Sequence, residues 1–256
     1  MTSIKNRIVF ITGASSGIGK AAATQFATLG AHILVCARRI EKVQSLADAL
    51  KKKYNVRTHA FQLDVRNQKA VEASLNALPA DWSNISVLVN NAGLSRGLDN
   101  VQDASIEDWD DMIDTNVKGL LYVSRAVLPG MIERNEGHII NIGSVAGHWT
   151  YAKGNVYAAT KFAVNALSQG MKMDLLGTPI RITSIDPGLV ETDFSVVRFH
   201  GDEERAKKVY QGLTPLTPED IADSIVWAAT RPAHVNVNNI ILMSTDQSSP
   251  TMVHRK

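Results

Sequence analysis

Apolar and polar positions follow two alternating patterns along the chain. Short runs of apolar, often β-branched residues are separated by longer segments with apolar residues at helical spacing. The first run is Ile8 to Ile11, and the segment from Ile18 to Leu29 follows it, closed by Gly30. A glycine directly after the last periodic residue is typical of a helix C-terminus. The pattern therefore predicts a strand, a helix and a turn, in that order.

The same order repeats through the first half of the chain. Strand-like runs follow at residues 33–35, 58–63 and 87–89, and helices are expected between them at about 41–53 and 67–78. These runs are almost continuously apolar rather than alternating, which is typical of strands buried on both faces of a parallel sheet. The fold class expected is therefore α/β, a doubly wound parallel sheet with helices on both of its faces.

The second half begins with a longer helical pattern. Ser105 is followed by an acidic residue three positions later, which predicts a capping box at a helix start. Trp109, Met112, Ile113 and Asn116 follow at spacings of three and four residues. Asn116 is therefore expected on the apolar stripe of this helix, which continues through Val127.

The rhythm of strands and helices then continues almost to the end. Strands are expected at 139–142, 180–185 and 240–243, with a helix around Tyr157 and another opened by Thr217 and Pro218. Residues 189–214 show no clean period, and a loop of that length in a compact domain is usually a lid or a binding loop. A tail of thirteen residues, Ser244 to Lys256, follows the last strand.

Length and composition favour one soluble α/β domain. A chain of 256 residues is within the range of a single large domain. We expect residues 1–256 to form one catalytic domain, with a cofactor-binding half at about 5–115, a catalytic half at about 116–245 and a tail at 246–256. The net charge is +2 and no Lys/Arg block exceeds three residues, which argues against nucleic acid or an acidic membrane as a partner.

The cysteine content and the hydropathy of the chain indicate its cellular compartment. The single cysteine, Cys36, lies in an apolar run and reads as a core residue. No apolar stretch approaches the roughly 20 residues of a membrane span, and residues 1–7 are too polar for a secretory signal. We therefore expect a cytoplasmic protein. The seven histidines include no His-x-x-x-His pair and no Cys/His cluster has metal-ligand spacing, so no metal is expected.

Three residues between 144 and 161 suggest proton exchange with an alcohol or a carbonyl. Tyr157 and Lys161 are four residues apart in a helix-compatible segment, so both project from one face. Ser144 ends a strand-like run, at the edge where α/β sheets bind ligands. Lowering a tyrosine pKa by three units takes roughly 4 kcal/mol, and an ammonium about 5 Å away supplies roughly 3 kcal/mol. Lys161 is therefore expected to lower the pKa of Tyr157. Taken alone, a Tyr-x-x-x-Lys pair is more often an ordinary amphipathic helix.

A glycine-rich turn follows the first strand. Gly13, Gly17 and Gly19 lie where backbone N–H groups and the helix dipole can receive a phosphate, so the turn favours a dinucleotide. Arg38 and Arg39 end the second strand, where an enzyme that prefers NAD would place an acidic residue. The two cations favour a 2′-phosphate and hence NADP, although a solvated basic pair is the alternative.

Further polar or small residues end other strands. Asp64 could accept a hydrogen bond from an adenine amino group or only cap the next turn. Asn90 to Gly93 are small enough to let the backbone approach a flat ligand. Asn116 could hold a water beside Lys161 or be a satisfied core amide. Pro187-Gly188 with Thr192 could bracket a nicotinamide amide or form an ordinary turn.

Taken together, these motifs resemble those of the short-chain dehydrogenase/reductase family, over residues 5 to about 245. The resemblance implies a Rossmann fold with a seven-stranded parallel sheet, an NADP (NADPH) cofactor and a catalytic set of Asn116, Ser144, Tyr157 and Lys161. It also implies a set of cofactor-binding residues. These are Gly13, Ser15, Ser16, Gly17, Ile18, Gly19, Arg38, Arg39, Asp64, Val65, Asn90, Asn91, Ala92, Gly93, Tyr157, Lys161, Pro187, Gly188, Val190 and Thr192.

Three features point to one subgroup of that family. The pair Arg38-Arg39, the segment from Tyr210 to Ala222 and the run from Asn236 to Gln247 are similar to the NADP-dependent 3-hydroxy acid dehydrogenases, which act on serine and allo-threonine. The function expected is hydride transfer between the nicotinamide and the hydroxyl-bearing carbon of a small 3-hydroxy acid. A reductase of a ketoacyl thioester, sugar or other ketone is the alternative. A catalytically silent dinucleotide sensor is a more remote one.

The substrate site is expected to hold a cation or several hydrogen-bond donors, because an unpaired carboxylate in a closed pocket costs several kcal/mol. Ser144 and Tyr157 would hold the reacting oxygen, and Arg96 or Gln247 could hold the carboxylate. Arg198 and Arg255 are further candidates.

The expected assembly is a homotetramer. The helix bearing Tyr157 carries several alanines that allow close packing. The tail could extend at most about 45 Å, enough to reach a neighbouring subunit.

Overall fold

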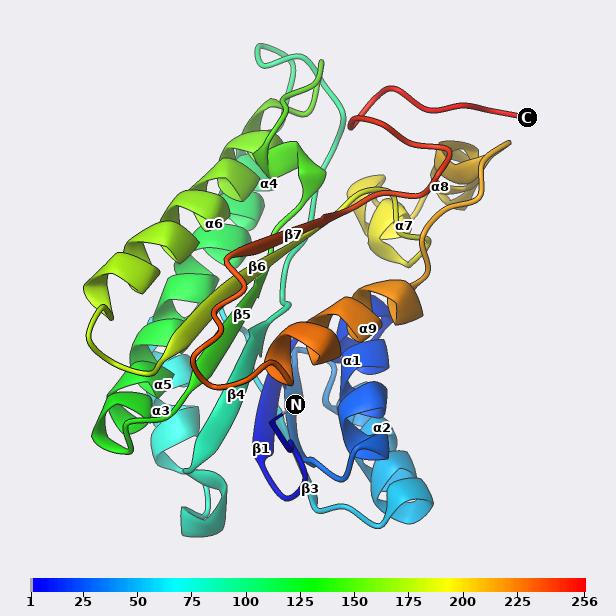
Figure 1. Cartoon of the computed structure of the whole chain (residues 1–256). Coiled ribbons are helices and arrows are strands. Elements are labelled where there is room, and N and C mark those ends of the chain that lie inside the picture. Colours follow the sequence, from blue (N-terminus) through cyan, green and yellow to red (C-terminus); the bar gives the residue numbers. More distant parts are fainter. Residues whose placement is uncertain (1) are drawn as a thin grey trace.

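Seven strands form one parallel sheet in the order β3-β2-β1-β4-β5-β6-β7 (Figure 1). The structure is a computed structural model that describes residues 2–256. The strands are β1 Ile8–Thr12, β2 His32–Ala37, β3 Thr58–Gln62, β4 Ile85–Asn90, β5 His138–Ile142, β6 Arg181–Pro187 and β7 Asn239–Leu242. The expected α/β fold with seven parallel strands is confirmed. The order reverses between β1 and β4, and the carboxyl ends on either side of such a switch point form a crevice for ligands.

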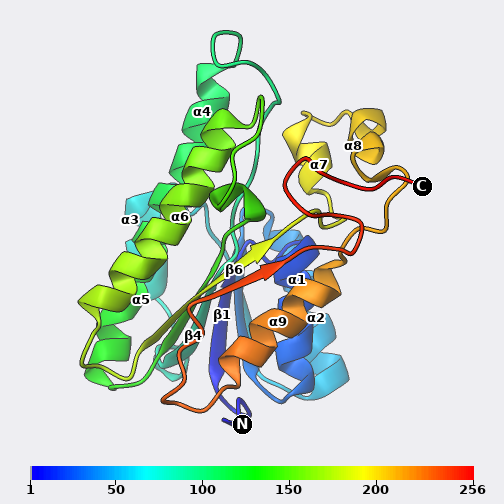
Figure 2. The ribbon, with the colours of Figure 1, turned by 45° about the horizontal axis from the view of Figure 1, so that its top comes forward.

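Helices cover both faces of the sheet. The α-helices are α1 Gly17–Thr28, α2 Ile40–Tyr54, α3 Gln68–Asn76, α4 Ile106–Ile113, α5 Leu120–Glu133, α6 Asn155–Asp174, α7 Phe194–Arg198, α8 Glu203–Tyr210 and α9 Pro218–Ala229. In both views α1, α2 and α9 lie on one side of the sheet, and α3, α4, α5 and α6 lie on the other (Figures 1 and 2). The sheet therefore separates two apolar cores.

Helix starts follow local hydrogen bonding. The Thr217 side chain accepts a hydrogen bond from the Asp220 backbone, the Asp220 side chain returns one, and Pro218 occupies the first turn of α9. Ser105 caps α4 by accepting from the Asp108 backbone, but the capping box expected there is only half formed, because the Asp108 carboxylate binds His200 instead. Both starts agree with the sequence, because Ser and Thr satisfy backbone N–H groups that have no partner within the helix.

The long helix expected through Val127 is interrupted. Residues Asp114–Gly119 form a π-helical turn between α4 and α5, and α5 continues to Glu133. Such turns are rare and often occur at functional sites. Asn116 lies in this turn and is 2% exposed.

The segment 189–214 is not the irregular loop that the sequence suggested. It contains the short helices α7 and α8, which lie beside the carboxyl ends of the strands (Figure 2). Five to eight residues are too few to show a hydrophobic period. This explains why the pattern missed both helices.

The end of the C-terminal tail packs on its own chain beside α8. The Lys256 N–H donates to the Gly212 carbonyl at 2.6 Å, and the Arg255 guanidinium donates to the carbonyls of Val209 and Gln211. The last two residues are therefore held on their own subunit, and contact of the tail with a neighbouring subunit stays a prediction.

Within residues 2–256, each helix is too short or too polar to cross a membrane.

Candidate active site

A cavity of about 580 Å³ lies at the carboxyl ends of the strands. Its volume falls within the 300–1,000 Å³ of typical ligand sites. Most of the residues expected to bind cofactor or substrate line it. These are Gly13, Ser15, Ser16, Gly17, Ile18, Arg38, Arg39, Asp64, Val65, Asn91, Ala92, Gly93, Ser144, Tyr157, Lys161, Pro187, Gly188, Val190, Thr192 and Gln247. Four expected residues, Gly19, Asn90, Asn116 and Arg96, are not among those that line this cavity.

The glycine-rich turn packs closely against the segment after β4. Gly13 has a φ of 65°, and a Cβ there would lie 2.8 Å from the Ala92 Cα. The Thr12 hydroxyl accepts hydrogen bonds from the backbone N–H groups of Asn91 and Ala92, at 3.1 and 3.0 Å. The turn and this segment therefore form one rigid wall, a geometry that only glycine at position 13 allows.

Arg38 and Arg39 lie at one end of the cavity and are exposed. Arg39 donates to the Ser15 hydroxyl at 2.9 Å, which brings the basic pair against the glycine-rich turn. Asp64 also lines this end, but its carboxylate accepts from Arg66 at 2.7 Å. Partial burial raises the pKa of Asp64, but the Arg66 hydrogen bonds outweigh this and leave it below the usual value. Asp64 thus stays ionised and anchors its own turn.

Asn90 faces the core rather than the cavity. Its amide nitrogen donates to Ser124 and Asn141, both at 2.9 Å, and its side chain is buried among helices and strands. It was expected to contact a cofactor, but Asn90 is the last residue of β4 and alternate strand residues point to opposite faces. Asn90 therefore ties β4 to β5, and the next residue, Asn91, lines the cavity.

Tyr157 and Lys161 share one face of α6, as predicted, and both are buried. The Lys161 ammonium lies 5.8 Å from the centre of the Tyr157 ring and donates to the Ile142 carbonyl at 2.9 Å. Ser144 follows β5 at the start of a short 3-10 turn, where its hydroxyl accepts from the Ala146 N–H at 3.1 Å. All three side chains line the same cavity.

Burial is the largest influence on the pKa values of Tyr157 and Lys161. Burial, helped by the neighbouring phenol of Tyr151, raises the pKa of Tyr157, whereas the Ser144 hydrogen bond and the Arg198 cation act in the opposite direction. Burial also lowers the pKa of Lys161 to about 8, opposed by the Asp186 carboxylate. The expected lowering of the Tyr157 pKa by Lys161 is therefore not seen. Burial of the phenol raises this pKa by more than the neighbouring groups lower it.

Asn116 clamps the segment after Gly93. Its side-chain oxygen accepts from the Leu94 N–H at 2.9 Å, and its amide nitrogen donates to the Leu94 carbonyl at 2.8 Å and to Thr160 at 3.1 Å. Both donor positions of this amide are thus used by the protein. The contacts show that Asn116 holds the Leu94 backbone in place. Its role in ordering a water stays a prediction.

The candidates for holding a carboxylate occupy different places. Arg96 is bound by Asp111 at 3.3 Å and donates to the Val197 carbonyl at 2.8 Å. The Gln247 side chain accepts from the Leu189 N–H and donates to the Ser249 carbonyl. Both therefore hold backbone in place, as the Arg255 guanidinium does beside α8.

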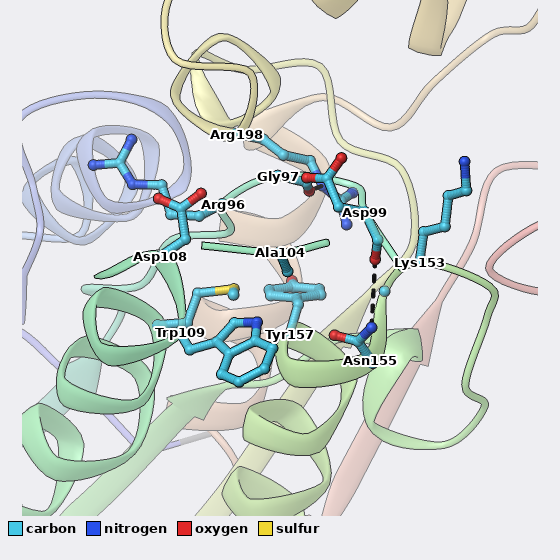
Figure 3. A pocket seen from close by; sticks show the side chains of 12 residues that line it. Arg96, Gly97, Asp99, Ala104, Asp108, Trp109, Lys153, Asn155, Tyr157 and Arg198 are labelled. Atoms are coloured by element: carbon cyan, nitrogen blue, oxygen red, sulfur yellow. Dashed lines mark hydrogen bonds between the residues drawn. The ribbon is translucent and has the colours of Figure 1, made fainter. Parts of the chain in front are cut away.

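Arg198 is placed differently from these three. Its guanidinium carbon lies 5.6 Å from the centre of the Tyr157 ring, and it donates to the Tyr151 hydroxyl at 2.5 Å and the Gly97 carbonyl at 3.2 Å. Arg198 lines the large cavity. It also lines a second, much smaller cavity of about 10 Å³, which has room for about one water (Figure 3). Figure 3 shows Tyr157 and Arg198 on the wall of this small cavity, and Arg96 reaches only this one.

Comparison with known proteins identifies the family. The family model for short chain dehydrogenases matches residues 7–203. This chain belongs to the short-chain dehydrogenase family. It is 54% identical over 250 residues to the NADP-dependent 3-hydroxy acid dehydrogenase YdfG of Salmonella typhi, which covers 97% of this chain and 99% of that protein.

Two further comparisons bear on the site. The chain is 45% identical over 242 residues to sulfoacetaldehyde reductase 2 of Chromohalobacter salexigens, covering 94% of this chain and 95% of that one. It matches a solved structure described as the closed form of serine dehydrogenase complexed with NADP+, with a TM-score of 0.91, 50% identity and coverage of 97% of this chain and all of the other. These similarities extend over nearly the whole length of each chain.

Sequence reasoning missed several residues around Tyr157. Tyr151 binds Arg198, and the Phe194 ring meets the Tyr157 ring edge-on at 5.7 Å. Both come from segments without a clear period, so only the fold brings them to Tyr157. Among residues 2–256, no three His, Cys, Asp or Glu side chains are grouped so as to hold a metal ion.

Proposed function

We propose that this protein is an NADP-dependent oxidoreductase that transfers a hydride between the nicotinamide and the hydroxyl-bearing carbon of a small 3-hydroxy acid. The observation that carries the substrate class is the position of Arg198, a cation beside the Tyr157 ring and on the wall of the large cavity. Support for NADP comes from Arg38 and Arg39 and from the cofactor named for two of the relatives.

The cavity fits a dinucleotide. Gly13, Gly17 and the first turn of α1 present backbone beside the cavity, where a pyrophosphate is favoured by the helix dipole. At one end, the two arginines can make charge-assisted hydrogen bonds to a 2′-phosphate. At the other end, Pro187, Gly188 and Thr192 lie beside Tyr157 and Lys161, where a nicotinamide would be held.

Each residue of the catalytic set has a role that its contacts support. Tyr157 exchanges the proton with the substrate oxygen, and Ser144 holds that oxygen by a hydrogen bond. The Lys161 ammonium favours the ionised phenol and can also bind a ribose hydroxyl. Asn116 fixes the segment that carries Leu94 and is proposed to order a relay water. An oxidised nicotinamide held by Pro187, Gly188 and Thr192 would supply the hydride acceptor and a positive charge that would favour the phenolate.

An acid substrate agrees with the chemistry of the relatives. The names of the relatives describe 3-hydroxy acids, serine and sulfoacetaldehyde, and each of these compounds carries an anionic group close to the reacting carbon. Arg198 is the proposed anchor for such an anion, because it lines the large cavity beside the Tyr157 ring and its bonds to Tyr151 and Gly97 use only two of its five N–H donors. L-allo-threonine, L-serine and 3-hydroxyisobutyrate-like acids are the proposed substrates.

The second candidate function is reduction of a small carbonyl compound that carries an anion. The 45% identity to sulfoacetaldehyde reductase 2 favours it. A panel of hydroxy acids, matched alcohols without the carboxylate, sugars, ketoacyl thioesters and sulfoacetaldehyde, assayed with NADP and NADPH, tests both functions. Equal kcat/KM for alcohols with and without the carboxylate would remove the acid assignment.

We also propose a cytoplasmic homotetramer in which residues 1–256 form one catalytic domain, divided near 115 into cofactor-binding and catalytic halves. Several exposed apolar side chains lie on two pairs of elements. Leu121, Phe162 and Met173 lie on α5 and α6, and Trp227 and Ile241 lie on α9 and β7. Two such surfaces suit the two kinds of contact in a tetramer with dihedral symmetry. Light scattering that gives the mass of a monomer at assay concentrations would exclude this assembly.

A further inference from the structure

A buried carboxylate lies directly behind the catalytic group. Asp186 is the sixth residue of β6, and its side chain is fully buried. It packs against Gly143, the residue before Ser144, so closely that a Cβ at position 143 would clash with the carboxylate. The Asp186 charge acts on both Lys161 and Tyr157, and in each case it raises the pKa. A negative charge here therefore opposes formation of the Tyr157 phenolate.

His148 is the cationic or proton-sharing partner of this carboxylate. Its Nε2 donates to Asp186 Oδ2, which requires a proton on Nε2 because a carboxylate only accepts. The other partners of Asp186 are neutral: the Ser184 hydroxyl at 2.5 Å and the Asn239 amide at 2.5 Å. Leaving a buried carboxylate without a charged partner is costly, so the imidazole is the group able to offset the charge.

The His148 side chain is partly open to solvent. Its side chain is 26% exposed, whereas that of Asp186 is fully buried. The Asn165 amide lies 3.2 Å from Nε2 and donates to the Gly147 carbonyl at 3.0 Å, which fixes the turn that carries the imidazole. The ring of Trp149 packs beside the imidazole at 5.6 Å. The ionisable groups described around Asp186 are thus His148 from the 3-10 turn and Lys161 and Tyr157 from α6, while β6 and β7 contribute neutral groups.

We propose that His148 is a positioning residue for the reaction, which neutralises the buried Asp186 carboxylate so that the charge of Lys161 serves Tyr157 alone. The inference rests on the proposed oxidoreductase function. His148 touches neither substrate nor cofactor in this scheme, because Asp186 and Gly143 separate it from the cavity. His148 acts electrostatically. By offsetting the charge of Asp186, it changes the electrostatic field at Tyr157, the acid/base residue.

The experiment compares the pH profiles of kcat/KM for five proteins: wild type, His148→Gln, His148→Arg, Asp186→Asn and the double variant His148→Gln/Asp186→Asn. Glutamine can keep a hydrogen bond to Asp186 but carries no charge. For His148→Gln we expect the kinetic pKa of the acid/base to rise by about one unit, with roughly tenfold lower activity below that pKa and recovery above it. His148→Arg keeps the cation and is expected to keep the wild-type profile.

The double variant separates charge from structure. Removing both charges restores neutrality, so its kinetic pKa is expected to return toward the wild-type value even if the fold is less stable. A purely structural role of His148 would give lower stability and a lower kcat at every pH, with no such return. His234→Gln, an exposed histidine in the loop after α9, is the matched control and should leave the profile unchanged.

A second readout does not depend on turnover. Lysine labelled at the ε-carbon is titrated by NMR, with Lys161→Met used to assign the Lys161 signal. In His148→Gln the unneutralised carboxylate is expected to raise the Lys161 pKa above its wild-type value, and the double variant should reverse this. An unchanged Lys161 titration together with an unchanged kinetic profile overturns the inference. Absence of activity in the wild type on every compound of the panel would instead count against the proposed function.

Discussion

The guanidinium carbon of Arg198 lies 5.6 Å from the centre of the Tyr157 ring. A cation at this distance does two things to the phenol: it lowers the pKa of Tyr157, against the larger effect of burial, and it provides a place for an anion close to the proton-transfer group. The remaining donors of Arg198 can bind a carboxylate in two-point fashion. The contact with Tyr151 fixes the guanidinium before any ligand arrives.

Replacing Arg198 should therefore change the discrimination between acids and alcohols. Arg198→Met is expected to lower kcat/KM for 3-hydroxy acids by about 10²-fold or more, because a two-point contact has two charged hydrogen bonds that contribute roughly 1.5–3 kcal/mol each. Alcohols without a carboxylate should lose less. Steady-state kinetics on matched pairs measures the difference, with Arg125→Met as the control, since Arg125 is 79% exposed on α5. An equal loss for both compounds would assign Arg198 to structure alone.

The parts of the fold set by periodicity could be predicted from the sequence, and the parts set by loops could not. Runs such as Ile8 to Ile11 must be buried on both faces, which determines a parallel sheet whatever the details of the turns. By contrast, Arg96 and Arg198 are both arginines in segments without a period. Nothing in their spacing shows that Asp111 binds one and leaves the other beside Tyr157. Only tertiary contacts distinguish them.

Cofactor preference should depend on the basic pair after β2. Arg38 and Arg39 are exposed on the cavity, so their charges are available to a 2′-phosphate. We expect NADP to exceed NAD in kcat/KM by two or more decades, and Arg39→Asp to reduce or reverse this preference. The measurement is kcat/KM with each cofactor for both proteins. Equal use of the two cofactors by the wild type would show that the pair is only solvated charge.

Removing the Tyr157 hydroxyl should separate binding from chemistry. Tyr157→Phe keeps the ring that packs against Phe194, so the fold and cofactor binding are expected to persist. General acid/base catalysis contributes about 10²–10⁴-fold, and turnover should fall by at least that amount. Cofactor fluorescence titration and steady-state assays measure the two properties. Wild-type turnover in this variant would refute the assigned mechanism.

The direction of individual side chains at strand ends was the other limit of sequence reasoning. Asn90 and Asn91 are adjacent and chemically identical, yet the first binds Ser124 in the core and the second lines the cavity. A shift of one residue in a strand reverses the face, and the point where the last residue leaves the sheet is not visible in a hydrophobic pattern. The motif Asn-Asn-Ala-Gly lies at the cavity, but its sequence does not show which of its members line that cavity.

The last prediction concerns the stability cost of Lys161. Burial lowers the pKa of this ammonium to about 8 from its ordinary value near 10.5, so the folded protein holds the charge less readily than the unfolded chain. Below pH 8 both states are protonated and the full penalty is present, at most about 3 kcal/mol. Between pH 8 and about 10.5 the unfolded state binds more protons, so wild-type stability should rise with pH relative to a variant without this group.

Lys161→Met tests this directly. Methionine has a similar length and no charge, but it loses the hydrogen bond to the Ile142 carbonyl, which offsets about 1 kcal/mol. We expect the variant to be inactive and yet more stable than the wild type by about 1–2 kcal/mol at pH 7, with the advantage shrinking as pH rises toward 10. Urea unfolding of both proteins at a series of pH values measures the difference. A variant that is less stable than the wild type at pH 7 would show that the Lys161 charge is compensated within the fold, with Asp186 as the nearest candidate for that compensation.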